Sequence, residues 1–149
     1  MSDYEFTMSL RIRHPSADPA QITRALGIEP QHTWRAGDVR RDSEGGALGG
    51  EYRETFWMGR LMAQPKLASE RIGVESELAQ TLAQLRKSQD LFELLKEQGG
   101  VTELHVSIFA REEFRLEFAP ASLATLGRLG LTVALEVKPH PGSPPQAVS

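Results

Sequence analysis

The chain has 149 residues, which suits one domain large enough to bury a hydrophobic core. It contains no cysteine, which excludes disulfide bonds, thiolate catalysis and cysteine-ligated metal sites. Its formal net charge is −3, from 17 basic and 20 acidic residues. This balance disfavours a nucleic-acid partner, because binding to phosphates requires a positive surface.

Nothing in the sequence indicates a membrane or an export route. The first six residues lack a basic segment followed by an apolar stretch, so they do not form a secretory signal. No run of about 18 apolar residues is present to span a bilayer. We therefore expect a cytoplasmic protein that does not associate with a membrane.

The first predicted strand covers residues 4–13, where apolar and polar side chains alternate. A period of two indicates one buried and one solvent-facing side, which is typical of an antiparallel or mixed sheet. A short helix follows, with Asp18 as its N-cap and Pro19 at its first position. Gly27 suits the left-handed residue that ends such a helix.

The next part of the chain is polar and rich in glycine. Residues 33–35 predict a short strand that ends at the turn Gly37–Asp38. Residues 39–50 predict either a mobile loop or an open hairpin connection. Residues 52–61 predict another strand, in which Gly59 indicates a bulge or a close approach.

Helical spacing returns in residues 74–98, where one kinked helix or two abutting helices would both fit. Two alternating runs, 103–108 and 113–118, predict the strands of a hairpin. A short helix is expected over 120–130, and the last strand over 131–137. Residues 139–149 contain four prolines and no apolar period, and predict a disordered tail.

This order of elements predicts a single α+β domain over residues 1–138. We expect a mostly antiparallel sheet of five or six strands with two to three helices on one face. From its third element onward, the chain should contain a ferredoxin-like (split βαβ) unit. The helix-facing side should be lined by the apolar members of the alternating strands, namely Tyr4, Phe6, Met8, Leu10, Ile12, Leu104, Val106, Ile108, Phe114, Leu116, Phe118, Val133 and Leu135.

The sequence contains no motif for catalysis or for binding a metal or a cofactor. The glycine pairs at 45–50 lack the spacing of a phosphate-binding loop, and no serine lies in a nucleophile elbow. The four histidines share no metal-ligand spacing; they are His14, His32, His105 and His140. We predict no catalytic residue, metal or cofactor, and a role other than an enzyme is favoured.

One segment combines the residue types that dominate binding surfaces, tryptophan and arginine. An arginine side chain presents a planar fork that matches carboxylates and phosphates. A structural interpretation competes, since the first tryptophan could cover the edge of the core and the first arginine could pair with an aspartate. The candidate binding residues are Trp34, Arg35, Asp38, Arg40, Arg41 and Trp57.

Four stretches near the start of the chain form a distinctive set: Ser9–Ile12, Asp18–Thr23, Leu26–Pro30 and Trp34–Asp38. Together they resemble a bacterial family of small uncharacterised proteins, the domain of unknown function number 4279. The resemblance covers most of residues 4–138 and implies a bacterial intracellular protein. It implies no activity, cofactor or catalytic residue. Some bacterial proteins of similar size are immunity or accessory proteins beside toxins, which is an analogy of size and style.

Two hypotheses of function follow. The first is a non-enzymatic protein–protein interaction or accessory module, which includes pairing with itself as a homodimer through open sheet edges. The second is a binder of, or an enzyme on, a small anionic ligand, with Arg35, Arg40 and Arg41 holding the anion and a tryptophan stacking on a ring. Arg11 and Arg13 are further candidates for the anion. Binding to nucleic acid is disfavoured by charge.

Overall fold

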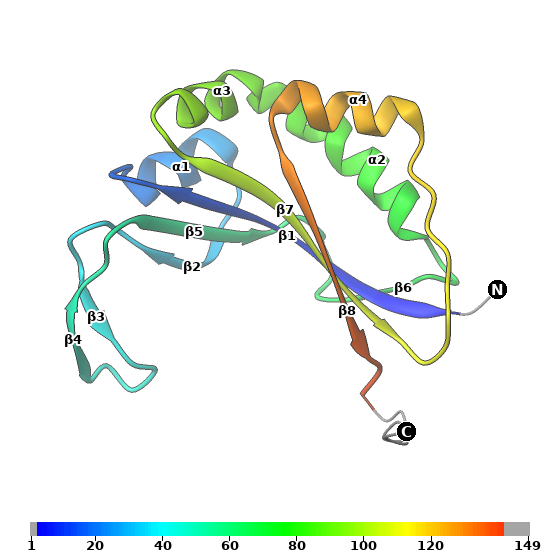
Figure 1. Cartoon of the computed structure of the whole chain (residues 1–149), viewed down its shortest axis with the longest axis horizontal. Coiled ribbons are helices and arrows are strands. Elements are labelled where there is room, and N and C mark those ends of the chain that lie inside the picture. The colour runs from blue at the N-terminus through cyan, green and yellow to red at the C-terminus, as the bar shows by residue number, and fades with distance from the viewer. Residues whose placement is uncertain (1–2, 142–149) are drawn as a thin grey trace.

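The protein is an α+β protein, and the computed structural model describes residues 3–141 (Figure 1). The six strands of the main sheet are β2 (Pro30–Trp34), β5 (Thr55–Arg60), β1 (Tyr4–His14), β7 (Val101–Ala110) and β8 (Thr132–Pro139), in spatial order, with the short β6 (Leu67–Ala68) beside β1. The helical elements are α1 (Pro19–Leu26), α2 (Val74–Leu85), the 3-10 turn η1 (Arg86–Ser88), α3 (Gln89–Glu97) and α4 (Pro120–Leu129). A separate ribbon pairs β3 (Val39–Arg41) with β4 (Ala47–Glu51).

The sheet is mixed, with β1 near its centre. Because β1 is antiparallel to both β5 and β7, those two strands run parallel with β1 between them. By the same reasoning β2 runs parallel to β1 with β5 between them. Two split βαβ units therefore interlock, which confirms the predicted ferredoxin-like unit but places it from β1 to β7 rather than later in the chain. Only β8 joins its neighbour β7 in parallel, after the crossover through α4.

The helices lie on one side of the sheet, and the core lies between them and the strands (Figure 1). Five apolar side chains of β1 face the helices and are at most 7% exposed, as the alternation predicts; they are Tyr4, Phe6, Met8, Leu10 and Ile12. On β7 the predicted core residues Leu104, Val106 and Ile108 are also buried. Leu135 lies on the predicted helix-facing side, opposite Val106, but it is 45% exposed on the edge strand β8 and does not belong to the core. The last helix, α4, contacts α2 and α3 and leaves that edge uncovered.

The prediction of a hairpin strand over residues 113–118 is wrong, because residues 111–119 pair with no strand in the part of the chain that the structure describes. Phe114, Leu116 and Phe118 nevertheless pack against the core, as their alternation indicates. The centroid of the Phe114 ring lies 5.2 Å from that of Tyr4. A parallel β8 requires a crossover after β7, and this extended segment begins that crossover.

The two predicted alternatives for residues 74–98 are resolved as two helices, α2 and α3, joined by the turn η1. Helix α2 begins after Gly73, which has no side chain to act as a cap. Its first backbone N–H, that of Val74, instead donates to the Tyr4 hydroxyl at 3.0 Å. A residue of β1 therefore fixes the start of a helix that is distant in sequence.

Residues 39–50 form the hairpin β3–β4, which corresponds to the second of the two predicted alternatives. At its tip, the Asp42 carboxylate accepts hydrogen bonds from the backbone N–H groups of Glu44 and Gly46. At the other end of the chain, β8 continues to Pro139, and the His140 backbone N–H donates to the Ala110 carbonyl. Ordered structure thus extends past the predicted domain end at 138, and residues 142–149 of the predicted tail lie outside the described residues.

Within residues 3–141, no helix is long and apolar enough to cross a membrane.

Candidate functional site

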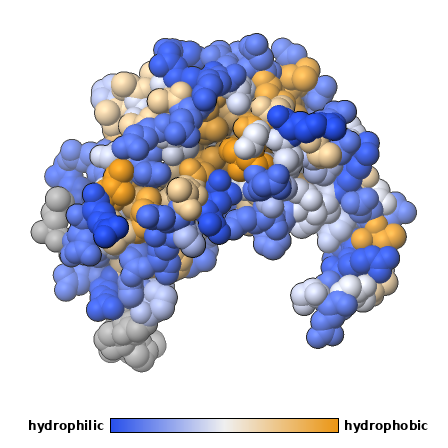
Figure 2. Space-filling model, turned by 180° about the vertical axis from the view of Figure 1, so that it is seen from behind, coloured by the Kyte–Doolittle hydropathy of each residue, from blue (hydrophilic) through white to orange (hydrophobic). Residues whose placement is uncertain are grey.

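The helices cover one face of the main sheet, and we call the other face the free face. Figure 2 shows the molecule from behind as an arch, hollowed between the ribbon β3–β4 and the end of β8. The free face forms the inner surface of this arch, and the ribbon projects from one end of it (Figure 1). A concave surface of this kind can surround a partner on more than one side, so we built the candidate site from the residues on it.

The strand register determines which side chains share the free face, because residues opposite one another on neighbouring strands point to the same side. At one end, Trp34 lies opposite Phe56, which in turn lies opposite Arg13. Further along β1, Arg11 lies opposite Met58 of β5. Aromatic and cationic side chains from three strands therefore meet on the free face.

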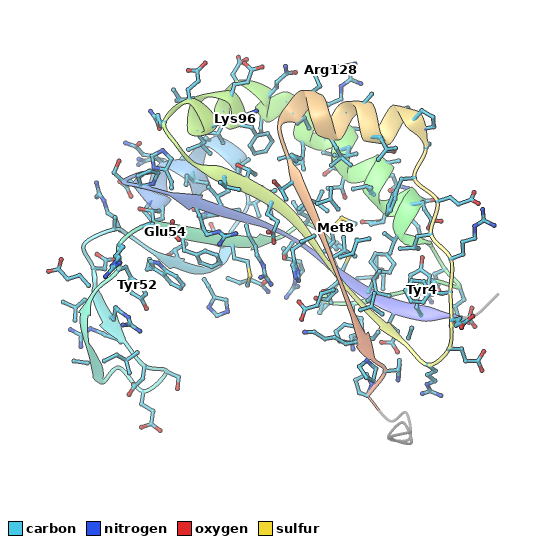
Figure 3. All side chains as sticks on the ribbon, in the orientation of Figure 1. Tyr4, Met8, Tyr52, Glu54, Lys96 and Arg128 are labelled. Carbon is cyan, nitrogen blue, oxygen red and sulfur yellow. The ribbon has the colours of Figure 1, made fainter. Side chains whose placement is uncertain are left out.

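Three aromatic rings stack where the ribbon leaves the sheet, and we call Trp34, Tyr52 and Phe56 the aromatic cluster. The ring centroid of Trp34 lies 4.4 Å from that of Tyr52, at an interplanar angle of 13°. It lies 4.6 Å from that of Phe56, at an angle of 26°. Tyr52 lies at the base of the ribbon, together with Glu54 (Figure 3). Trp34 is only partly exposed, because two neighbouring rings cover much of its surface.

A turn of the backbone positions this cluster. The Asp38 side chain accepts a hydrogen bond from the Arg35 backbone N–H at 2.8 Å, and the Asp38 N–H donates to the Arg35 carbonyl at 2.9 Å. Two further backbone hydrogen bonds, each 2.9 Å, join Gly37 and Asp38 to Tyr52. The predicted turn is therefore what brings Tyr52 onto Trp34.

A hollow of about 620 Å³ adjoins the aromatic cluster. Trp34 and Tyr52 form its apolar part, and Pro15 completes that side. Two arginines, Arg40 and Arg53, line it with two carboxylates from the end of the ribbon, Glu51 and Glu54. The hollow thus offers ring faces for stacking and guanidinium groups for an anion.

His105 lies in the middle of the free face and is buried, at 6% exposure. Ser9 and Ala134 flank it on the two neighbouring strands. Its Nε2 lies 3.1 Å from a carboxylate oxygen of Glu136. Hydrogen bonds from Lys138 first, and from His105 second, lower the pKa of the Glu136 carboxyl.

Several arginines lie on the free face or in the hollow that adjoins it. Arg11, Arg40, Arg53 and Arg60 form no ion pair within residues 3–141. The Nε of Arg11 is buried and has no hydrogen-bond partner in the same part of the chain. Arg13 is 3.9 Å from Glu103, which is a long and exposed contact of little energetic value.

The structure brings together only part of the predicted set of binding residues. Trp34 and Arg40 line the same hollow. Arg35 lies elsewhere, 3.9 Å from Asp18, in a hollow between α1 and α3. Arg41 donates from Nη1 to the Gly45 carbonyl at 3.0 Å and so closes the ribbon.

The remaining two predicted residues have structural contacts. Asp38 forms the turn described above. Trp57 is fully buried in the core, and its Nε1 donates to the Thr23 hydroxyl of α1 at 3.0 Å. Adjacent residues of a strand point to opposite faces, so Phe56 lies on the free face while Trp57 does not.

Sequence reasoning missed Tyr52, Phe56, Arg53 and Arg60 as members of this surface. For Phe56 and Arg60, the signal that could have found them is the alternation in β5, where every second residue from Phe56 to Arg60 faces the free side; Tyr52 and Arg53 precede this strand. The continuous apolar run of residues 56–58 concealed that alternation. To predict that Trp34 lies opposite Phe56, one must also know the order of the strands, which no local sequence pattern reveals.

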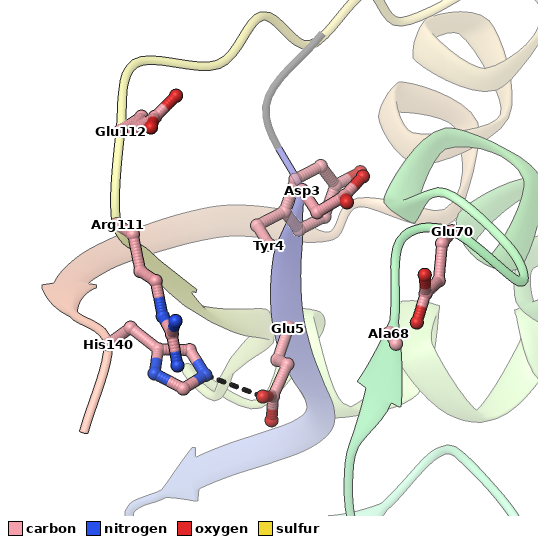
Figure 4. A pocket seen from close by; sticks show the side chains of 8 residues that line it. All are labelled: Asp3, Tyr4, Glu5, Ala68, Glu70, Arg111, Glu112 and His140. Carbon is pink, nitrogen blue, oxygen red and sulfur yellow. Dashed lines mark hydrogen bonds and ion pairs between the residues drawn. The ribbon is translucent and has the colours of Figure 1, made fainter. Parts of the chain in front are cut away.

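A second hollow, of about 430 Å³, lies at the other end of β1 (Figure 4). Figure 4 shows the side chains of Arg111 and His140 together on one side of it, with Glu5 facing the histidine. The His140 Nε2 lies 2.6 Å from Glu5 Oε1, and this hydrogen bond is the main cause of the lowered pKa of the Glu5 carboxyl. Within residues 3–141, no cluster of three or more acidic or histidine side chains has a geometry that could hold a metal ion.

Comparison with known proteins gives a family and no activity. Residues 4–140 match the model of the family described as "Domain of unknown function (DUF4279)". No curated protein and no solved structure matches the chain. The function therefore has to be argued from the surfaces of the molecule itself.

Proposed function

The chain belongs to the DUF4279 family, and we propose that it is a non-enzymatic protein-interaction module. On this proposal, its free face binds an acidic segment of a partner protein that carries an aromatic side chain. Such a role is that of an accessory protein in a bacterial cytoplasm, of the kind that immunity proteins exemplify. The partner is defined here by its chemistry, anionic and aromatic, rather than by name.

One observation carries this proposal: the aromatic cluster lies beside arginines, Arg40 and Arg53, that form no ion pair within residues 3–141. Buried aromatic and arginine side chains supply most of the energy at protein interfaces. Trp34 is already held in place by its stacked neighbours, so it loses little conformational entropy on binding. Unpaired guanidinium groups favour a partner with carboxylates, which they can bind through two parallel hydrogen bonds.

The shape of the site favours an extended segment over a reacting small molecule. The free face is an open concavity (Figure 2), and it extends across several strands of the main sheet (Figure 1). Its central histidine, His105, is buried and bonded to Glu136, so it is poorly placed to exchange protons with a substrate. An extended chain lying on the sheet would meet the aromatic cluster and the arginines in succession.

A peptide titration tests the proposal. The probe is a short peptide in which glutamate alternates with tyrosine, compared with a peptide in which lysine replaces glutamate. Tryptophan fluorescence reports binding, and Trp34→Phe is the optical control because it leaves only the buried Trp57. We expect the acidic peptide to quench Trp34, and the basic peptide to have no effect.

Variants then locate the binding surface by calorimetry. Trp34→Ala should weaken binding of the acidic peptide at least about thirtyfold, the effect of losing a hot-spot residue worth about 2 kcal/mol. Arg60→Gln should weaken it about tenfold, and the control Arg115→Gln, at an exposed arginine in the crossover after β7, should leave it unchanged. Equal binding of acidic and basic peptides, or indifference to Trp34→Ala, would refute the proposal.

A second candidate function is the binding of a small anionic aromatic ligand, favoured by the hollow of about 620 Å³ beside Trp34 and Tyr52. Its volume falls in the range of ligand pockets, roughly 300–1,000 Å³. Phenyl phosphate and phenylacetate are suitable probes. Saturable binding that requires Arg40 and Arg53 but not Arg60 would favour this second function, because only the first two arginines line the hollow.

A further inference from the structure

The two edges of the main sheet differ in how well they are protected. Strand β2 forms one edge, is five residues long and begins with Pro30. Its register with β5 is interrupted between Pro30 and His32. Proline, irregular register and short length are the usual means by which proteins protect an edge from pairing with another chain.

Strand β8 forms the other edge and has no such protection. It is eight residues long and pairs with β7 without any irregularity, from Thr132 to Pro139. Its only proline is the last residue of the strand. Within residues 3–141 no strand pairs with its outer side, so the backbone groups there form an open template for another strand.

Apolar side chains are also exposed along this edge. Leu135 and Val137 are 45% and 59% exposed, whereas their register partners on β7, Val106 and Ile108, are 1% and 0% exposed. Register partners in neighbouring strands share a face, so Leu135 and Val137 lie on the helix side of the sheet, beyond the cover of the helices. Burying these two side chains against another chain would be favourable, because it would remove their apolar surface from water.

The sequence of β8 is complementary to itself when two copies run antiparallel with Leu135 opposite Leu135. Val133 then lies opposite Val137 on the helix side, and Thr132 lies opposite Lys138 on the free face. Centring the pair on Glu136 instead would place two carboxylates directly opposite, which is destabilising. Centring it on Val137 would place Leu135 opposite Pro139, which has no N–H to donate.

We propose that two copies of the chain pair through their β8 edges in the register centred on Leu135, which joins the two sheets into one. A two-fold axis perpendicular to the sheet relates the copies, so the contact is the same from both sides. A hollow beside Val137, lined also by Phe114 and Arg111, faces the start of the partner's β8 in this register. Exposed Leu123 of α4, at 54%, adds apolar surface on the element that precedes the strand. Pairing through β8 involves different residues from the binding proposed for the aromatic cluster, and each can be tested independently of the other.

Sedimentation of the full chain tests the pairing. We expect a dimer whose dissociation constant rises at least about tenfold in Leu135→Lys, because two like charges then meet on the axis. The matched control is Leu94→Lys, which changes a leucine of similar exposure, 49%, on α3 and should leave the dimer intact. A monomer at concentrations up to about 1 mM, or a dimer that Leu135→Lys leaves unchanged, would overturn the proposal.

The absence of cysteine from the chain allows an independent test that does not depend on how well Leu135→Lys folds. In Leu135→Cys, the two thiols would lie opposite each other across the axis, within reach of a disulfide under mild oxidation. Leu94→Cys serves as the control for random collision. We expect a disulfide-linked dimer from Leu135→Cys that forms much faster than from the control, and equal rates would contradict the pairing.

Discussion

The two tryptophans should respond differently when each is truncated to alanine. Trp57 is fully buried, and its Nε1 donates to Thr23 at 3.0 Å. The packing around it is tight: a Cβ placed on Gly59 would come within 2.5 Å of the Trp57 ring. We expect Trp57→Ala to lower the free energy of unfolding by about 3–5 kcal/mol, the range for truncating a large buried aromatic side chain. This is a large part of the roughly 5–15 kcal/mol by which a domain is stable.

Trp34→Ala should cost less stability, because its ring is partly exposed and its packing is confined to the aromatic cluster. It loses two stacked aromatic pairs, each worth roughly 0.5–1.5 kcal/mol, so we expect a loss of about 1–3 kcal/mol. Urea unfolding followed by circular dichroism measures both variants. The change in free energy is obtained from the shift in midpoint, provided that the slope with denaturant is unchanged.

Binding of the acidic peptide provides the second measurement. Trp34→Ala should abolish most binding while the protein remains folded, and Trp57→Phe should retain binding because it keeps an aromatic ring in the core. If Trp34→Ala destabilises the fold as much as Trp57→Ala does, the aromatic cluster is structural. The proposed binding of a partner on the free face then loses its main support.

Three further predictions concern stability. Tyr4→Phe leaves the buried N–H of Val74 without its acceptor and should lower the free energy of unfolding by about 1–3 kcal/mol, measured in urea. Ile108→Ala, at a fully buried position, should lower it by about 2–5 kcal/mol in the same assay. The pKa of the Glu136 carboxyl is lowered in the folded protein, so its ionised form contributes to folding stability. This contribution is fully present above the ordinary pKa of 4.5 and is lost as the pH falls through the lower pKa of the folded state. Wild type and Glu136→Gln should therefore differ in Tm near neutral pH and converge in acid, and a constant difference would contradict this.

The elements that the sequence predicts best are those whose signals are local. In helix α1, the Asp18 carboxylate accepts from the Ala20 N–H at 3.0 Å, and Gly27 has a φ of 70°. Both features follow from residue types within one turn of the helix ends. The alternation over residues 4–13 likewise predicts the buried face of β1, because side chains on a strand alternate regardless of which strand lies next to it.

The features that the sequence does not predict depend on contacts between distant segments. Residues 113–118 alternate as a strand would, but alternation indicates only which side chains are buried and not whether the backbone has a partner. Leu135 continues the apolar pattern of β8, yet its burial depends on whether a helix reaches the sheet edge. The binding surface likewise depends on contacts between distant segments, since Trp34 stacks on Tyr52 only after the ribbon has folded back.

The two proposals together predict a distance that can be tested. With both copies related by an axis perpendicular to the sheet, their free faces lie on the same side. From β5 of one copy to β5 of the other there are seven strand spacings, counted along β5-β1-β7-β8 and back. At about 4.8 Å each, these spacings amount to roughly 34 Å across the strands. Phe56 lies opposite Arg13, and Arg13 lies opposite Val101, which is level with a position five residues before Leu135 on β8. The two clusters are therefore also offset by ten residues, or about 33 Å, along the strands, and their separation is roughly 47 Å.

A bivalent peptide can reach both clusters only if its linker spans that distance. An extended chain covers about 3.3 Å per residue, so the linker needs at least roughly fourteen residues, and more if it is flexible. Two acidic peptides joined by a linker well above that length should bind the wild-type dimer at least about a hundredfold more tightly than one peptide does. With a linker of about four residues, or with Leu135→Lys, the gain should disappear, because only one cluster is then within reach. A gain that persists in Leu135→Lys would show that the second contact comes from elsewhere on the same copy, and would separate the pairing of β8 from the function of the free face.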